Sequence, residues 1–131
     1  MKVRVPLKHA GSFGRAISAI SATALLGVLI AALTLSPMEA GAGPEGVDKL
    51  YHVLAFASLA FPISIVRPRW ALWVGLGVIA YGGAIEIVQP AFGREAEWVD
   101  FVAVGIGAIL GATSGYFLSG RFRALSRRSG G

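Results

Sequence analysis

The sequence predicts an all-α integral membrane protein, a bundle of four transmembrane helices with both termini in the cytoplasm. Charged residues make up only 15% of the 131 positions and hydrophobic residues 55%, whereas a soluble domain carries about 25% charged residues. Four stretches lack lysine, arginine and aspartate, and their lengths approach the roughly 20 residues with which a helix crosses a bilayer. These stretches are 17–35, 50–66, 70–88 and 101–118.

The first stretch, 17–35, has two interpretations. Basic residues precede it and the small-residue sequence Ala40-Gly41-Ala42 follows it, a pattern that also marks a secretory signal peptide with its cleavage site. The stretch is longer than the apolar part of a typical signal peptide, which favours a retained helix. Cleavage would leave the three later helices in the same orientation.

Small and polar residues share single faces of the next two helices. A helix turns by about 100° per residue, so residues spaced three, four or seven apart lie on the same side. In a membrane helix, a face that carries ionisable groups turns toward protein or water and away from lipid. The two faces are Asp48, His52, Ala55, Leu59 and Pro62 in the second helix, and Gly75, Gly82, Glu86 and Gln89 in the third.

The fourth helix carries a small residue at every fourth position. These residues are Ala103, Gly107, Gly111, Gly115 and Ser119. Such spacing lets the backbone of a neighbouring helix approach closely in lipid. The pattern therefore predicts that this helix packs tightly against another helix of the bundle.

The distribution of charge predicts the orientation in the membrane. Ten lysines and arginines lie on the side of the two termini, with no acid among them, and the opposite side is mostly acidic. Because cytoplasmic segments of membrane proteins are rich in lysine and arginine, both termini are predicted to be cytoplasmic. The predicted organisation is a basic N-terminus at 1–16, a transmembrane domain at 17–118 and a basic tail at 119–131.

Composition also bears on the partners. A chain without cysteine has no disulfide framework, no thiolate metal site and no cysteine nucleophile. The net charge of +5 does not indicate nucleic-acid binding, because the basic residues form short clusters beside membrane helices without a recognition fold. Such clusters contact anionic lipid headgroups. The predicted partner is the lipid bilayer, and no nucleic acid is expected.

Polar side chains at the outer ends of three helices form a candidate ligand-binding site. Ionisable groups within membrane helices are costly and normally face a protein interior or a watery cavity. Glu86 lies inside an apolar stretch, so we expect it to be paired with His52 or Arg94. The expected cluster is Asp48, His52, Glu86, Gln89, Arg94 and Asp100.

Several of these residues also have purely structural interpretations. Asp48 and Asp100 each stand near the start of a helix, where an aspartate can act as the N-cap. Arg94 can pair with Glu97 or Asp100 and order the loop. Lys49 is expected to extend toward the headgroups. Each aspartate alone is more commonly a cap than a catalytic group.

The spacing of the polar residues does not name a ligand. No short ligand motif such as His-Glu-x-x-His is present, so neither a metal nor a cofactor is predicted. Carboxylates beside a histidine can do acid–base work. No serine, threonine or cysteine adjoins His52 to indicate a covalent nucleophile. An arginine beside a watery pocket can hold a phosphate.

At these residues the sequence resembles the VanZ-like family of bacterial membrane proteins. The resemblance runs from about 47 to about 116, roughly half of the chain. It is carried by the order and spacing of motifs on successive helices rather than by one of them alone. The motifs are Asp48-Lys49-Leu50-Tyr51-His52, Glu86-Ile87-Val88-Gln89, Gly93-Arg94, Glu97, Asp100, Gly107 and Gly111.

The resemblance implies a location and a role. The family's namesake is associated with resistance to the glycopeptide teicoplanin, which implies a multi-pass protein of the bacterial cytoplasmic (inner) membrane that serves the cell envelope. The polar motifs would face outward, as the charge bias also predicts. We expect the site, with His52 and Glu86 at its centre, to bind a glycan, a lipid-linked precursor or a peptidoglycan-like ligand. The family commonly has asparagine four residues after the last aspartate, where this chain has Val104. That difference leaves the site poorer in hydrogen-bonding groups.

Two other functions stay open at this point. One is a membrane enzyme that acts on a lipid-linked cell-wall or polysaccharide precursor, with His52 as acid–base and Arg94 as anion holder. The other is a structural or partner-binding membrane protein whose polar residues only hold the helices together. The sequence alone does not choose among them, and it does not set the oligomeric state.

Overall fold

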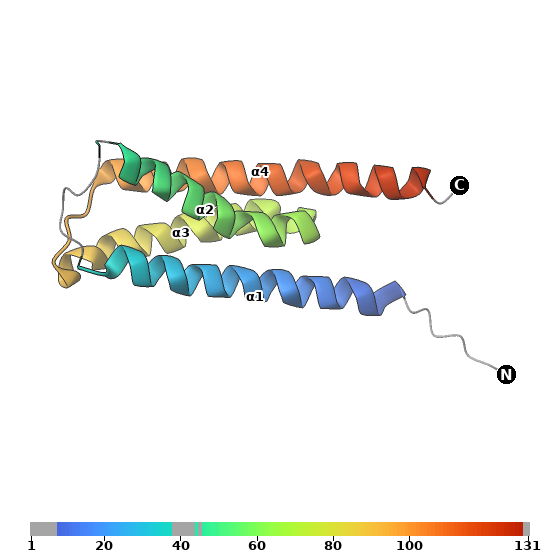
Figure 1. Ribbon diagram of the computed structural model, residues 1–131, viewed down its shortest axis with the longest axis horizontal. Helices are drawn as coiled ribbons and strands as arrows, with labels where there is room; N and C mark the ends of the chain where they lie inside the picture. The colour runs from blue at the N-terminus through green and yellow to red at the C-terminus, as the bar shows by residue number, and fades with distance from the viewer. Residues whose placement is uncertain (1–7, 38–43, 45, 130–131) are drawn as a thin grey trace.

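The computed structural model describes residues 8–37, 44 and 46–129, and its main elements are four long helices (Figure 1). The described residues contain no strand, so the predicted all-α four-helix fold is confirmed. The predicted cleavage sequence at residues 40–42 lies outside the described part. The helices are α1 (Lys8–Leu35), α2 (Val47–Val66), α3 (Ala71–Val88) and α4 (Trp98–Arg128), with short 3-10 helices η1 (Pro68–Trp70) and η2 (Gln89–Phe92).

Local sequence explains where the middle helices end. Arg67 precedes a proline and has an extended backbone, with φ −128° and ψ 72°, as expected because proline disfavours the helical conformation of the residue before it. Gly93 ends η2 with φ 74°, a left-handed conformation that glycine adopts without steric cost. The first three helices end at Leu35, Val66 and Val88, where the predicted stretches also end.

The outer helices are longer than the apolar stretches that predicted them. α1 begins at Lys8 rather than at residue 17, and α4 continues to Arg128 rather than ending at residue 118. Alanine, leucine, arginine and lysine are all good helix formers, so a helix need not stop where its apolar stretch stops. The predicted flanking segments 1–16 and 119–131 therefore contain helical residues.

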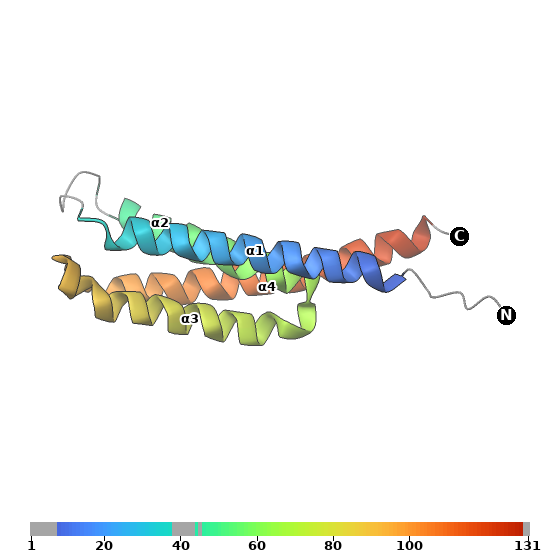
Figure 2. The same cartoon turned by 90° about the horizontal axis from the view of Figure 1, so that it is seen from below.

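The helices alternate in direction, so that oppositely charged segments lie at opposite ends of the bundle. The start of α1, the α2–α3 turn and the end of α4 lie toward one end, as Figures 1 and 2 show. The start of α2, the end of α3 and the start of α4 lie toward the other end. Arginines therefore mark the first end, whereas Asp48, Glu86, Glu97 and Asp100 lie toward the second.

The outside of the bundle is apolar along its length. Leu25 is 72% exposed, Leu72 69% and Ile87 81%, and large apolar side chains exposed in this way indicate contact with lipid rather than water. All four helices are long and apolar enough to cross a membrane. The chain is a multi-pass membrane protein.

The closest helix contact joins α4 to α2 along the predicted line of small residues. Ala103, Gly107, Gly111, Gly115 and Ser119 are all buried. A Cβ atom at Gly111 would overlap the carbonyl oxygen of Ala57, and a Cβ atom at Gly107 would overlap that of Val53. The two backbones touch only because these positions lack side chains. The predicted packing of α4 is confirmed.

The first helix is attached to this core by few polar contacts. The Tyr81 hydroxyl donates a hydrogen bond to the Gly27 carbonyl over 2.5 Å. The Thr23 hydroxyl donates to the Leu59 carbonyl over 3.4 Å. Ile30 adds a buried apolar side chain. α1 thus packs against α2 and, over a smaller area, against α3.

Candidate functional site

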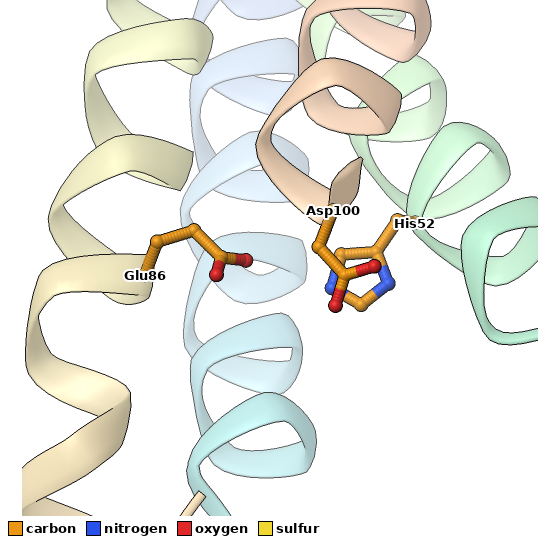
Figure 3. Close-up of side chains that lie close together, drawn as sticks. All are labelled: His52, Glu86 and Asp100. Atoms are coloured by element: carbon orange, nitrogen blue, oxygen red, sulfur yellow. The ribbon is translucent and has the colours of Figure 1, made fainter. Parts of the chain in front are cut away.

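Three ionisable side chains from three helices converge at the acidic end of the bundle. His52 comes from α2, Glu86 from the last turn of α3 and Asp100 from the first turn of α4. Each offers one nitrogen or oxygen atom, and these atoms all lie within 4.8 Å of one another. Figure 3 shows the Glu86 side chain pointing from its helix toward Asp100. We call His52, Glu86 and Asp100 the polar layer.

Glu86 and Asp100 are buried, His52 is half-buried, and all three are short of hydrogen-bond partners. Glu86 is 8% exposed and Asp100 7%. Within the described residues, Glu86 Oε2, His52 Nε2 and Asp100 Oδ1 are buried atoms without a hydrogen bond. A buried polar group that makes no hydrogen bond typically costs about 1–3 kcal/mol. Within the described residues no hydrogen bond or salt bridge joins Glu86 to His52 or Arg94, although ligand atoms of Glu86 and His52 lie within 4.8 Å of each other.

The backbone of α2 sets the proton position on His52. Its Nδ1 atom lies 3.0 Å from the carbonyl oxygen of Asp48. A carbonyl oxygen only accepts, so Nδ1 carries the hydrogen and donates it. In the neutral ring, Nε2 then carries a free lone pair. Nε2 lies in the polar layer and has no hydrogen-bond partner among the described residues.

An apolar layer closes the site one helical turn deeper. Phe56, Gly82 and Val104 lie four residues from His52, Glu86 and Asp100 on the same three helices. A Cβ atom at Gly82 would overlap Val104 Cγ1 and lie 3.1 Å from Phe56 Cε1, so the three residues are in contact. Val104 and Phe56 are 0% and 1% exposed. The position four residues after Asp100 is thus occupied by a fully packed apolar side chain.

Lys49 forms salt bridges with a second set of carboxylates beside the polar layer. Its Nζ atom lies 2.7 Å from Asp48 Oδ2, 2.6 Å from Glu97 Oε2 and 3.2 Å from Asp100 Oδ1. The expectation that Lys49 extends to the headgroups is therefore wrong, since it bridges α2 to the start of α4. The sequence hint was the pair of acids at positions 97 and 100, three residues apart and on one side of a helix start. We call Lys49 with Asp48, Glu97 and Asp100 the lysine cluster.

Two of the six predicted site residues turn toward α1 instead. Gln89 is 1% exposed, and its Nε2 atom donates to the Thr34 carbonyl over 3.5 Å. Arg94 Nη1 donates to the Ser36 carbonyl over 3.3 Å. Both side chains thus bond carbonyls at the end of α1, which its own helix leaves unsatisfied. The expected pairing of Arg94 with Glu97 or Asp100 is wrong, since Lys49 pairs with both acids.

Neither aspartate acts as an N-cap. α2 is preceded by Gly46 and α4 by Glu97, and neither cap residue makes a side-chain hydrogen bond. Asp48 and Asp100 lie inside the first turns of their helices, where the helix dipole favours a negative charge. Asp48 therefore belongs to the lysine cluster, and Asp100 belongs to both the lysine cluster and the polar layer.

The polar layer is rich in acceptors and poor in donors. Two carboxylates and an imidazole with a free lone pair can bind a cation, accept hydrogen bonds from hydroxyl or amino groups, or exchange protons. The same charges repel a phosphate. The arrangement thus favours a ligand that brings hydrogen-bond donors or positive charge.

No protein-family model, curated protein or solved structure matches this chain. The length and composition of its four apolar helices show that the chain is a multi-pass membrane protein. Within the described residues, its polar interior at the acidic end consists of the polar layer, the lysine cluster and the two side chains that reach α1.

Proposed function

We propose that this chain is a VanZ-like protein of the bacterial cytoplasmic membrane whose polar layer binds a ligand of the cell envelope. One observation carries the proposal. The resemblance rests on several motifs along the chain, and His52, Glu86 and Asp100 come from three different ones of them. In the fold these three residues meet. A merely structural set of motifs would not need to bring buried acceptors without partners to one place.

The chemistry of the layer supports a glycan or peptidoglycan-like ligand. Sugar hydroxyls and amino groups are hydrogen-bond donors, and they complement Glu86 Oε2 and His52 Nε2. A phosphate held by Arg94 is less well supported, because Arg94 donates to the end of α1. The proposed ligand therefore binds through its hydroxyl or amino groups.

A second candidate, an enzyme that acts on a lipid-linked precursor, is favoured by a separate observation. A groove of about 570 Å³ lies between α1, α2 and α3. It is lined by apolar groups, and its members include Gly27, Leu59, Val74 and Tyr81. A groove of this kind can take a lipid chain while the polar part of the same molecule lies at the membrane surface. Under this alternative His52 supplies the acid–base group.

The orientation of the bundle is a prediction that cysteine labelling tests. The natural chain has no cysteine, so a single introduced thiol gives the whole signal. We expect Ala96→Cys, at the acidic end, to react with a membrane-impermeant maleimide in intact cells. Ser126→Cys, at the arginine-rich end, should react only after lysis, because basic segments stay in the cytoplasm. The reverse pattern would place the polar layer on the inside and exclude an envelope ligand.

The ligand-binding role predicts loss of phenotype without loss of fold. We expect Glu86→Gln and His52→Gln to melt in detergent near the temperature of the parent, because both changes keep a polar side chain of similar size. In a host that lacks the gene, both should fail to restore the parent's glycopeptide susceptibility pattern. The matched control is Glu95→Gln, the same chemical change at an exposed position, which should restore it.

Two results would contradict this role. If both variants are stable and restore the phenotype, the polar layer binds no ligand that matters in the envelope. If the phenotype instead follows the melting temperature across the set, the polar residues only hold the helices together. In either case the structural interpretation of the polar layer stands.

A further inference from the structure

The polar layer has the composition of a metal site. It offers one imidazole nitrogen and two carboxylates from three different helices, with the ligand atoms all within 4.8 Å of one another. Ligand atoms around a metal with bonds of about 2.1 Å stand at most about 4.2 Å apart. Small side-chain rotations therefore bring His52, Glu86 and Asp100 into coordinating range. The three ligands lie on separate helices, so they form no short ligand motif along the chain.

The burial of these side chains and their lack of hydrogen-bond partners also indicate a bound ligand. Glu86 is 8% exposed, and its Oε2 atom has no hydrogen bond to any described residue. His52 Nε2 is in the same condition. Figure 3 shows the Glu86 carboxylate directed toward Asp100, with the His52 ring beside it. Buried acceptors that share one direction indicate a common partner, and a cation satisfies all of them at once.

The hydrogen bond behind His52 is the one that metal-binding histidines make. A histidine ligand usually donates its second ring N–H to a carboxylate or a backbone carbonyl, which fixes the ring and leaves the other nitrogen free for the metal. His52 Nδ1 lies 3.0 Å from the carbonyl oxygen of Asp48. This contact is independent of the two carboxylates, and it presents Nε2 to the polar layer.

The neighbouring acidic group differs in a way that supports this choice. Asp48, Glu97 and Asp100 also bring three carboxylate oxygens together, but the Lys49 ammonium lies within 3.2 Å of each of them. That group already has its cation, and it shares Asp100 with the polar layer. Glu86 and His52 have no such partner among the described residues.

We propose that His52, Glu86 and Asp100 bind one divalent first-row transition-metal ion, with Zn²⁺ as the best-fitting ion. Two carboxylates and a neutral imidazole balance the charge of a divalent ion, so the buried layer becomes neutral. Mg²⁺ and Ca²⁺ prefer sites made of oxygen atoms only, whereas an imidazole nitrogen favours zinc and its neighbours. Three protein ligands also leave a coordination position for a ligand or water.

The metal site uses the same residues as the proposed ligand site, but it is tested without reference to cells. The full chain is purified in detergent, stripped with a chelator, and titrated with Zn²⁺, Mn²⁺ and Mg²⁺. We expect one Zn²⁺ per chain by elemental analysis after dialysis, and a higher melting temperature with Zn²⁺. Zn²⁺ should bind more tightly than Mn²⁺, as the usual order of divalent affinities predicts, and Mg²⁺ least tightly.

Variants then show which residues hold the metal. Glu86→Gln and His52→Gln should weaken Zn²⁺ binding by about 100-fold or more, since even the partners behind a metal ligand are worth about 10–100-fold. The matched control is His9→Gln, which removes the other histidine of the chain and should bind as the parent does. X-ray absorption spectra at the zinc edge of the unmodified protein provide a second measurement that needs no variant. They should show one imidazole and otherwise oxygen ligands.

Each outcome decides the matter. Failure of the unmodified chain to retain Zn²⁺, retention unchanged in Glu86→Gln and His52→Gln, or a spectrum without an imidazole would each overturn the metal site. Failure of the cellular phenotype alone would overturn the envelope role and leave the metal site standing. Loss of the metal site alone would leave a metal-free ligand site.

Discussion

Replacing Gly111 with leucine is expected to separate α2 from α4 and to destabilise the protein more than the other substitutions considered. Even a Cβ atom at this position would overlap the Ala57 carbonyl oxygen and lie 2.8 Å from Ala57 Cα. Both obstacles are backbone atoms, so rotation of a side chain cannot relieve them. Overpacking a well-packed interior costs about 1–3 kcal/mol and occasionally more, and here two helices must move apart. We expect a cost at or above the upper end of that range.

Two controls on the same helix separate this effect from a change in helix propensity. Gly105→Ala adds a Cβ atom that meets nothing within 4 Å, so it should be neutral or slightly stabilising. Leu110→Ile changes a residue that is 50% exposed and should also do little. The measurement is the melting temperature in detergent. If Gly111→Leu melts together with the parent, the close contact between α2 and α4 is wrong.

The second large effect is expected at Lys49, where methionine should destabilise the acidic end of the bundle. The substitution keeps an unbranched side chain but removes the ammonium that lies near three carboxylates. Exposed ion pairs are worth about 0–1 kcal/mol, whereas breaking a buried one costs about 3–5 kcal/mol. The Lys49 and Asp100 side chains are 29% and 10% exposed, so we expect about 1–3 kcal/mol.

A double substitution shows whether this loss comes from the carboxylates. In an Asp100→Asn background, Lys49→Met should cost clearly less, because one buried charge no longer needs its partner. Arg121→Met is the matched control, since it removes an exposed cation at the other end of α4 and should leave the melting temperature unchanged. Equal losses from Lys49→Met in both backgrounds would show that Lys49 and Asp100 are not coupled.

Much of the fold follows from the sequence because lipid imposes simple rules. A helix must be apolar over a fixed length to cross a bilayer, so the stretches predicted the four helices and the ends at Leu35, Val66 and Val88. Close contact between helices requires small residues, so the spacing of Gly107, Gly111 and Gly115 predicted that α4 packs tightly against another helix. What the sequence did not specify is which helix that is, because any α-helical backbone offers the same surface to a glycine.

The candidate site was predicted less completely for a related reason. Period and depth place His52, Glu86 and Asp100 at one level of the bundle, and the structure brings them together. The lateral order of the helices decides the rest. Because α1 ends beside α3 and η2, Gln89 and Arg94 reach its last carbonyls rather than Glu86. The choice between two nearby cations, Lys49 and Arg94, depends on distances that no spacing along the chain encodes.

The contact among Phe56, Gly82 and Val104 closes the polar layer on the side that faces the interior of the bundle. Deeper in the bundle, the buried core of the described residues is apolar, with members such as Leu59, Ala60 and Ala108. The hydroxyl of Ser64 is already committed to the Ala60 carbonyl. The apolar core of the described residues thus lies between the polar layer and the arginine-rich end. We therefore expect a proton or ion that binds in the polar layer to leave through the acidic end at which it entered.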